Sequence, residues 1–363
     1  MIIGVPKEIK THEYRVGLVP SAVKRFIDDG HQVIVETHAG ADIGYDDLSY
    51  VAVGAQIQKD AQSVFDNADM IVKVKEPQLS ECAMLREGQI LLTYLHLAPD
   101  PEQAKALMKS KCVAFAYETF TGDNGRGLPL LEPMSVVAGR LSVQEGAHHL
   151  QKHNGGLGRL MGGVGWADPV NVLVIGGGTA GFNAADVAVG MGANVTILER
   201  SEDRIAFLHD HFGRKAKILF SDTQTLEKCL VSADMVIGAV LIPGESAPKL
   251  VTKAHLKTMK PGSVMVDIAI DQGGCFETSK PTTHSNPTYE VDGVIHYCVA
   301  NMPGAVPLTS TLALNQVIVP YAQKLANLGW KACVEENQSF KEGLNVCHGK
   351  IVNKGVALSL KMD

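Results

Sequence analysis

The 363-residue sequence lacks the features that mark several protein classes. Its seven cysteines are scattered, odd in number and without a C-x-x-C pair, which favours reduced thiols over a disulfide framework or a zinc site. No apolar run approaches the roughly 18 residues needed to span a membrane. Charged residues such as Lys7, Glu8 and Lys10 lie where a signal peptide would be apolar, so we expect a cytoplasmic protein.

The chain also lacks a basic excess, short repeats and low-complexity segments. Lysine and arginine number 33 against 39 acidic residues, giving a net charge of −6, which argues against nucleic acid as the main partner. No H-E-x-x-H pattern occurs, and no metal is expected. Contents of 45% apolar and 20% charged residues are typical of a globular protein that buries a large core, and the length predicts two domains.

A glycine-rich turn in mid-chain is the clearest motif present. Gly176, Gly178 and Gly181 form a G-x-G-x-x-G pattern that directly follows the apolar run 172–175 and opens a small-residue helical pattern. The first glycine permits a tight turn, the second lets the backbone approach a pyrophosphate, and the third lets the helix pack closely on the strand. The phosphates would bind N–H groups at the helix N-terminus. The alternative is an ordinary strand–helix turn.

An acidic residue follows this turn at the distance expected for dinucleotide binding. Glu199 ends a second apolar run, 195–198, and lies 18 residues past Gly181. Its carboxylate would accept hydrogen bonds from the adenine ribose and repel a 2′-phosphate, which favours NAD over NADP. Arg200 leaves the opposite preference open, because an arginine can attract that phosphate.

Strand-like and helical patterns alternate along both halves of the chain. In the first half the strand-like runs are Ile2–Val5, Gln32–Glu36, Met70–Val74, Ile90–Leu95 and Val113–Tyr117. In the second half, besides the two runs around the glycine turn, they are Met235–Val240, Ser263–Ile270 and Gly293–Cys298. Such alternation predicts mostly parallel sheets covered by helices on both faces.

Glycine and proline mark the domain boundaries. A helical pattern that begins near Pro133 runs to about residue 153 and ends in a glycine-rich loop, 155–165. This loop lacks the Lys-Ser or Lys-Thr of a P-loop, so we interpret it as a flexible connection. Residues 301–307 are typical of a hinge. The helical pattern 308–328 then returns to the first domain, and Pro320 is expected to kink or interrupt it.

The predicted fold class is therefore α/β, with two doubly wound Rossmann-like domains, the first of them discontinuous, and an active-site cleft between them. Residues 1–130 and 305–363 would form the substrate (catalytic) domain, and residues 131–304 the NAD-binding Rossmann domain.

Four polar residues follow predicted strands at the edge where such folds bind ligands. Arg15 lies in the loop after the first strand, and Lys75, His96 and Asp271 directly follow later ones. We expect the first three to line one rim of the cleft, with Asp271 facing them. Arg15 offers a planar fork for a carboxylate, and Lys75 a point charge that can bind a carboxylate or polarise a carbonyl.

His96 is a natural proton carrier near neutral pH, and Asp271 could orient water or ammonia. Together with a nicotinamide, this set suggests a small 2-oxo or 2-amino acid as substrate. Each residue also has a structural interpretation. Arg15 and Lys75 could be solvated surface charges, His96 a structural histidine, and Asp271 a turn residue. Glu118, which ends a strand, could support the cleft or serve only the fold.

With these residues placed, the chain closely resembles the alanine dehydrogenase family over nearly all of its length. The resemblance rests on long ordered motifs, namely Gly4–Pro20, Val74–Pro77, Thr93–His96, Pro133–Ser135, Ala138–Arg140, Ile237–Gly244, Val266–Gly274 and Asn301–Gly304. These motifs are far more specific than the glycine turn alone.

The resemblance implies reversible oxidative deamination of L-alanine to pyruvate and ammonia, with NAD as cofactor, in a hexamer. It assigns the substrate to Arg15 and Lys75 and acid/base catalysis to His96 and Asp271. It also places dinucleotide contacts, beyond the three glycines, at Ser135, Thr179, Ala180, Glu199, Ser221, Val240, Leu241, Asp267, Ile268, Ala269, Ile270, Lys280, Val299, Ala300, Asn301 and Met302. At position 199 the family commonly has aspartate.

Three alternatives remain open at this point. The substrate could be another small amino or keto acid. The chain could correspond to the NAD-binding part of a proton-pumping transhydrogenase, although the intact acid/base residues and the lack of a membrane segment argue against this. It could also be a non-catalytic NAD-binding regulator.

Overall fold

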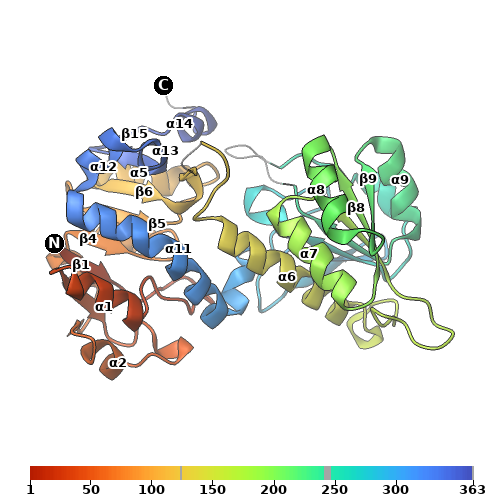
Figure 1. Ribbon diagram of the computed structural model, residues 1–363, viewed down its shortest axis with the longest axis horizontal. Helices are drawn as coiled ribbons and strands as arrows, with labels where there is room; N and C mark the ends of the chain where they lie inside the picture. The colour runs from red at the N-terminus through yellow and green to blue at the C-terminus, as the bar shows by residue number, and fades with distance from the viewer. Residues whose placement is uncertain (123–124, 241–246, 362–363) are drawn as a thin grey trace. The chain divides into compact units, whose positions relative to one another are not determined.

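The computed structural model describes residues 1–122, 125–240 and 247–361. The chain divides into two compact units, one formed by Met1–Met134 with Val306–Asp363 and the other by Ser135–Ala305 (Figure 1). Each unit is a mostly parallel sheet covered by helices, so the predicted fold class of two α/β domains, the first discontinuous, is confirmed. Helix α6 (Glu132–His149) carries the chain from the first unit into the second.

The sheet of the first unit has the strand order β15-β14-β6-β5-β4-β1-β2-β3. Its strands are β1 (Ile2–Val5), β2 (Gln32–Glu36), β3 (Gln56–Gln58), β4 (Met70–Val72), β5 (Ile90–Thr93), β6 (Val113–Ala116), β14 (Leu344–Cys347) and β15 (Lys350–Ile351). The six strands from the N-terminal segment pair in parallel. Helices α1 (Pro20–Asp28), α2 (Asp47–Val51), α3 (Ala61–Asn67), α4 (Leu79–Cys82) and α5 (Pro101–Ser110) connect them.

The C-terminal segment completes this unit. It supplies α11 (Pro307–Leu328), α12 (Trp330–Glu336), α13 (Gln338–Gly343), α14 (Lys354–Ser359) and the two remaining strands. In Figure 1 these blue elements lie against the red and orange N-terminal ones. Strand β14 pairs antiparallel with β6, and Val346 and Val356 join the buried core of the N-terminal strands. The first unit therefore needs both segments to bury its apolar surface.

The sheet of the second unit has the order β12-β13-β11-β10-β7-β8-β9. Its strands are β7 (Asn171–Ile175), β8 (Asn194–Glu199), β9 (Ala216–Phe220), β10 (Met235–Gly238), β11 (Val264–Asp267), β12 (Thr288–Val291) and β13 (Val294–Tyr297), all parallel except β12. Its further helices are α7 (Thr179–Gly190), α8 (Glu202–Phe212), α9 (Thr223–Ser232) and α10 (Lys253–Leu256).

Both sheets contain the same doubly wound strand order. In the first unit it reads β3-β2-β1-β4-β5-β6, and in the second β9-β8-β7-β10-β11-β13. Each is the 3-2-1-4-5-6 order of dinucleotide-binding folds, in which ligands bind beyond the carboxyl ends of the strands where the order reverses. These switch points lie between β1 and β4 in the first unit and between β7 and β10 in the second.

The strands that precede Lys75, His96 and Asp271 end earlier than their apolar patterns predict. Strand β4 ends at Val72, β5 at Thr93 and β11 at Asp267, after which a 3₁₀ helix covers Ile268–Gln272. Lys75, His96 and Asp271 therefore lie three to four residues beyond the strand ends and not directly after them. Apolar residues continue past each strand because these loops are themselves buried.

We expect Pro320 to kink or interrupt its helix, and the interruption does not occur. Helix α11 runs unbroken from Pro307 to Leu328 with Pro320 inside it. The proline is exposed, so water can bond the carbonyl oxygen of Gln316 that loses its helical donor.

Among the described residues, no helix is long and apolar enough to cross a membrane.

Candidate active site

The strand order of the first unit brings Arg15, Lys75 and His96 to one edge of its sheet. Strands β1, β4 and β5 are neighbours and run in parallel, so the loops after their carboxyl ends lie side by side. Tyr94 is close enough to Arg15 for each to affect the pKa of the other, and its ring stacks on that of His96. The charges of Lys75 and His96 both act on Glu76. The structure thus places these three side chains at one edge of the first sheet.

Arg15 is a buried cation and not a solvated surface charge. It is 2% exposed, and its Nε and Nη2 atoms donate to the two carboxylate oxygens of Glu13 at 2.7 and 2.6 Å. Its Nη1 lies 3.2 Å from the sulfur of Met134. Burial alone would lower the pKa of Arg15, but Glu13 more than compensates and the pKa is raised. The guanidinium is therefore charged and fixed in plane.

Lys75 is buried as well, with 5% of its surface exposed. Its Nζ lies 3.3 Å from Oε2 of Glu76, and Lys10 pairs with the other oxygen of that carboxylate. Although burial opposes ionisation, Lys75 and Lys10 lower the pKa of Glu76 to about 2. Lys75 is thus held beside a carboxylate that stays ionised, and the interpretation of both cations as surface charges is wrong.

A buried ion cluster lies directly before Lys75 in the chain. The Nζ atom of Lys73 lies 3.0 Å from Glu8 and 2.8 Å from Glu81, and all three side chains are almost fully buried. Oε1 of Glu8 also accepts the backbone N–H groups of Val74 at 2.7 Å and Lys75 at 3.4 Å. These carboxylates fasten the backbone that carries Lys75.

His96 is held by Glu118. The backbone N–H of His96 donates to Oε1 of Glu118 at 2.6 Å, and the N–H of Leu95 contacts both carboxylate oxygens at 3.2 Å. The His96 backbone is in the left-handed region, with φ of 47°. Its ring stacks on Tyr94 with 5.8 Å between centroids, and Nδ1 is 4.0 Å from Glu118. About a quarter of the side chain is exposed, which leaves a path for proton exchange.

In the second unit, the glycine turn has the geometry that a dinucleotide requires. Gly176 has φ of +96°, and a Cβ on Gly181 would lie 1.8 Å from the Gly176 carbonyl oxygen. A Cβ on Gly178 would meet nothing within 4 Å, so the space for an approaching pyrophosphate is open. Helix α7 starts there without a side-chain cap, whereas α8 and α9 are capped by Ser201 and Asp222. Its first N–H groups therefore suit a phosphate.

Glu199 bridges the glycine turn and the start of α8. Its carboxylate accepts the backbone N–H groups of Gly177 at 2.8 Å, Arg200 at 2.6 Å and Ser201 at 2.9 Å. This arrangement fixes the acid at the end of β8, where the ribose of a dinucleotide would lie. The sequence predicted Glu199 as the acidic residue but not its hydrogen bond with the glycine turn.

Arg204 is a candidate that the sequence interpretation missed. Its Nε donates to the carbonyl oxygen of Gly177 at 2.5 Å, and its guanidinium lies 4.4 Å from the ring centroid of Phe207. Burial lowers its pKa while Glu199 opposes that effect. Arg204 lies in the first turn of α8, the helix that follows Glu199, and this position is the sequence signal that could have identified it.

Asp271 lies in the loop after β11. It is exposed at the end of the 3₁₀ helix, and its Oδ1 accepts the N–H of Asn301 at 3.3 Å. Asn301 has φ of 62° and follows β13, so two predicted site residues from neighbouring strands meet here. The alternative of a turn residue stays open for Asp271, because Gly273 follows it with φ of 91°.

Asp267 is buried beneath this loop. Its carboxylate accepts hydrogen bonds from the N–H groups of Ala269 at 3.1 Å and Cys275 at 2.8 Å and from the hydroxyl of Ser279. Burial raises its pKa despite these bonds. Within this structure the Asp267 carboxylate anchors the loop that carries Asp271.

The other predicted dinucleotide contacts follow the strand ends of the second sheet. Ser221 follows β9, Val240 follows β10, Ile268, Ala269 and Ile270 follow β11, and Val299, Ala300 and Met302 follow β13. Thr179 and Ala180 open α7, Ser135 lies on α6, and Lys280 is exposed beyond the β11 loop. Leu241 lies outside the described residues. The parallel sheet thus gathers residues from four strands at one edge.

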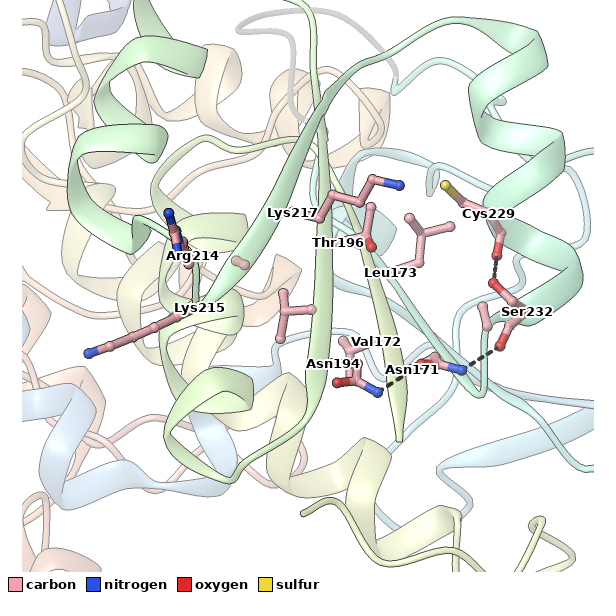
Figure 2. A pocket seen from close by; sticks show the side chains of 13 residues that line it. Asn171, Val172, Leu173, Asn194, Thr196, Arg214, Lys215, Lys217, Cys229 and Ser232 are labelled. Carbon is pink, nitrogen blue, oxygen red and sulfur yellow. Dashed lines mark hydrogen bonds between the residues drawn. The ribbon is translucent and has the colours of Figure 1, made fainter. Parts of the chain in front are cut away.

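A separate hollow of about 310 Å³ lies at the opposite edge of the same sheet (Figure 2). It is lined by the first residues of β7, β8 and β9, including Asn171, Asn194 and Lys217, and by Cys229 and Ser232 of α9. The glycine turn follows the other end of β7, so this hollow is not the predicted site. In the part of the chain that the structure describes, no group of three or more His, Cys, Asp or Glu side chains could hold a metal ion.

Comparisons with known proteins cover both units. Residues 4–138 match the family described as alanine dehydrogenase/PNT, N-terminal domain, and residues 142–354 match its C-terminal domain. The chain is 52% identical over 363 residues to the alanine dehydrogenase of Halomonas elongata, which covers all of this chain and 98% of that one. A solved L-alanine dehydrogenase superimposes with a TM-score of 0.94 at 48% identity and covers 99% of both chains. A transhydrogenase from Sinorhizobium meliloti shares the fold, with a TM-score of 0.84 at 24% identity over 97% of this chain and 100% of that chain.

Proposed function

Because this chain belongs to the alanine dehydrogenase/PNT family, we propose that it catalyses the NAD-dependent, reversible oxidative deamination of L-alanine to pyruvate and ammonia. One observation carries the proposal beyond the family. Two buried cations and a partly exposed imidazole gather at the switch point of the first sheet, where a small amino acid with one carboxylate would be bound.

The substrate carboxylate is assigned to Arg15 and Lys75. Both cations are buried, so little water competes with a carboxylate that binds them. Glu13 and Glu76 balance their charges when no substrate is bound, which lets the protein bury them. The fork of Arg15 is held in plane by Glu13, and this orients the carboxylate that binds beside it.

His96 and Asp271 are assigned to proton transfer and water positioning. When bound, the nicotinamide supplies the acceptor for the hydride that leaves Cα of alanine. Water adds to the resulting iminium ion and gives a proton to His96, which passes it to the nitrogen of the carbinolamine. As the C–N bond breaks, the carbinolamine hydroxyl loses its proton to His96, and pyruvate and ammonia are formed. Asp271 orients the attacking water. Glu118 holds the backbone of His96, and its partly exposed ring exchanges protons with solvent.

NAD is proposed as the cofactor because of Glu199. The open space at Gly178 and the uncapped start of α7 suit the pyrophosphate. The carboxylate of Glu199, fixed by three backbone N–H groups, suits the ribose hydroxyls and repels a 2′-phosphate. Comparing kcat/KM for NAD and NADP tests this choice, and equal values would contradict it.

The activity is tested by following NADH formation with L-alanine and NADH consumption with pyruvate and ammonia. Glycine, serine and 2-oxobutyrate are assayed in the same way as alternative substrates. We expect alanine and pyruvate to be preferred. The variant His96→Ala should lose on the order of a hundredfold or more in kcat, since general acid/base catalysis contributes this much. Unchanged alanine turnover in this variant would remove His96 from the mechanism. NAD binding without turnover of any amino acid would instead indicate a regulator.

We also propose that the protein acts as a hexamer in the cytoplasm. The family resemblance supports the hexamer, and the seven cysteines, all free, suit a reducing compartment. Light scattering coupled to size-exclusion chromatography measures the number of subunits, and a monomer would contradict the proposed hexamer.

A further inference from the structure

Helix α6 approaches the first turn of α7 too closely for any side chain at position 139. A Cβ on Gly139 would lie 2.2 Å from the carbonyl oxygen of Ala180, 3.0 Å from its carbonyl carbon and 3.1 Å from Cβ of Asn183. The first of these distances is more than 1 Å below the 3.4 Å at which ordinary van der Waals contact begins. The atom in the way is backbone, so it cannot swing aside, and a methyl group here would push the two helices apart.

The same contact is fastened by hydrogen bonds. Nε of Arg140, the next residue of α6, donates to Oδ1 of Asn183 at 3.0 Å. Nδ2 of Asn183 donates in turn to the carbonyl oxygen of Thr179 at 2.9 Å. Asn183 is 6% exposed, whereas the Arg140 side chain is half exposed, so both hydrogen bonds are partly buried. Through this one side chain, α6 is tied to the first residue of α7.

The residues that α6 contacts belong to the proposed pyrophosphate site. Thr179 and Ala180 lie between Gly178 and Gly181, and the N–H groups at the start of α7 have no partner within the helix. Ser135, a predicted dinucleotide contact, precedes Gly139 by one helical turn and so lies on the same face of α6. This spacing explains how a residue far before the glycine turn in sequence can reach the same ligand.

We propose that Gly139 and the Arg140–Asn183 hydrogen bond position the N-terminus of α7, and thereby set the affinity for the dinucleotide. The inference rests on the proposed function, because it assumes that a dinucleotide pyrophosphate binds at this helix start. Gly139 and Asn183 are assigned as positioning residues, because they contact α7 and act through it. A displacement of the helix start by about 1 Å exceeds the tolerance of a preorganised site, which is roughly 0.5 Å.

The test compares glycine-to-alanine substitutions in the full-length protein. Gly139→Ala is the test variant. Gly146→Ala is the packing control, because Gly146 lies on the same helix and the three atoms nearest to its Cβ would be side-chain atoms of Met235, the closest at 2.6 Å. Gly190→Ala is the neutral control, since Gly190 ends α7 in open space. The Kd for NADH is measured by fluorescence titration, together with thermal stability and the KM for alanine at saturating NAD.

We expect Gly139→Ala to raise the Kd for NADH by about tenfold or more, with the KM for alanine within about twofold of the wild type. Both control variants should keep the Kd within about twofold, even if Gly146→Ala melts at a lower temperature. A Gly139→Ala variant that binds NADH like the wild type would overturn the proposal. So would an equal loss of affinity in Gly146→Ala, because that result would mean that general destabilisation weakens binding.

A second variant covers the case in which Gly139→Ala does not fold. Asn183→Ala removes both hydrogen bonds but keeps α7 intact, since alanine is the best helix former. It should raise the Kd for NADH severalfold, and an unchanged Kd would count against the inference. Failure of the wild-type protein itself to bind NADH would refute the proposed function instead, so the two failures are distinguishable.

Discussion

The candidate residues of the first unit each come with a carboxylate. Arg15 pairs with Glu13, Lys75 with Glu76, and the His96 backbone with Glu118. A buried charge is tolerated only when it is paired and hydrogen-bonded, so burial of these cations demands the acids beside them. Glu13 and Glu76 are close to their cations in the sequence, whereas Glu118 lies 22 residues after His96, so this last pairing becomes evident only when the loops are folded.

Glu118 should prove to be a positioning residue for His96. Glu118→Ala removes the acceptor for two backbone N–H groups and releases a left-handed residue, so we expect kcat with alanine to fall on the order of tenfold or more. Glu118→Gln keeps one acceptor oxygen and should retain more activity. The KM for NAD should not change in either variant.

Steady-state kinetics measure these values, and Glu87→Gln is the matched control because Glu87 pairs with Lys111 on the surface. Equal losses in kcat and thermal stability for both Glu118 variants would indicate a structural role only.

Glu76 should make the stability of the protein depend on pH in the acid range. Its pKa is lowered from 4.5 to about 2, so ionised Glu76 contributes stability that is present above about pH 4.5 and is lost as the pH falls toward 2. The shift corresponds to roughly 3 kcal/mol at neutral pH. Denaturant unfolding between pH 6 and 3 should give a shallower decline for Glu76→Gln than for the wild type. Parallel curves for the two proteins would contradict this assignment.

At the scale of elements, a carboxylate accepts a backbone N–H group just after the end of several strands. The carboxylate of Glu8 takes the N–H of Val74 after β4, that of Glu118 takes the N–H of His96 after β5, and that of Asp267 takes the N–H of Ala269 after β11. In each case a side chain replaces the neighbouring strand as hydrogen-bond partner. The chain then leaves the sheet and can place a functional residue beyond its edge.

The two prolines of α11 should have opposite effects on stability. Pro320 costs the helix a hydrogen bond, so Pro320→Ala should raise the free energy of unfolding by about 1–2 kcal/mol after allowance for the more flexible unfolded chain. Pro307 is at the start of the helix, where a proline costs no helical hydrogen bond. Pro307→Ala makes the unfolded chain more flexible and should lower the free energy of unfolding by up to about 1 kcal/mol. Urea unfolding measures both. A loss of stability in Pro320→Ala would show that its ring contributes packing.

At the scale of the whole molecule, the two units differ in how the chain builds them. Unit two is one continuous segment, whereas unit one joins segments from both ends of the chain. Asn315 of α11 accepts the N–H of Val19 at 2.9 Å and donates to the carbonyl oxygen of Gly17 at 3.1 Å, which fastens the two segments together. The first unit therefore cannot be complete before the second has been synthesised.

A fragment of residues 135–305 should fold alone, while a fragment of residues 1–134 should not. The first keeps its sheet and its own buried core, and we expect cooperative unfolding and measurable NADH binding. The second loses β14 and α11 and exposes core residues such as Phe115. Circular dichroism and fluorescence titration check both. A well-folded 1–134 fragment would show that the C-terminal segment is dispensable.

The sequence by itself determined the fold class and the position of the glycine turn, because apolar periodicity and glycine geometry act over a few neighbouring residues. It also predicted Arg15, Lys75 and His96, since each follows a recognisable strand. Only the tertiary structure decided that both cations are buried against acids, that Arg204 reaches the glycine turn, and that Gly139 presses against Ala180. These features depend on the pairing of segments distant in the chain, and no local pattern encodes which distant segments meet.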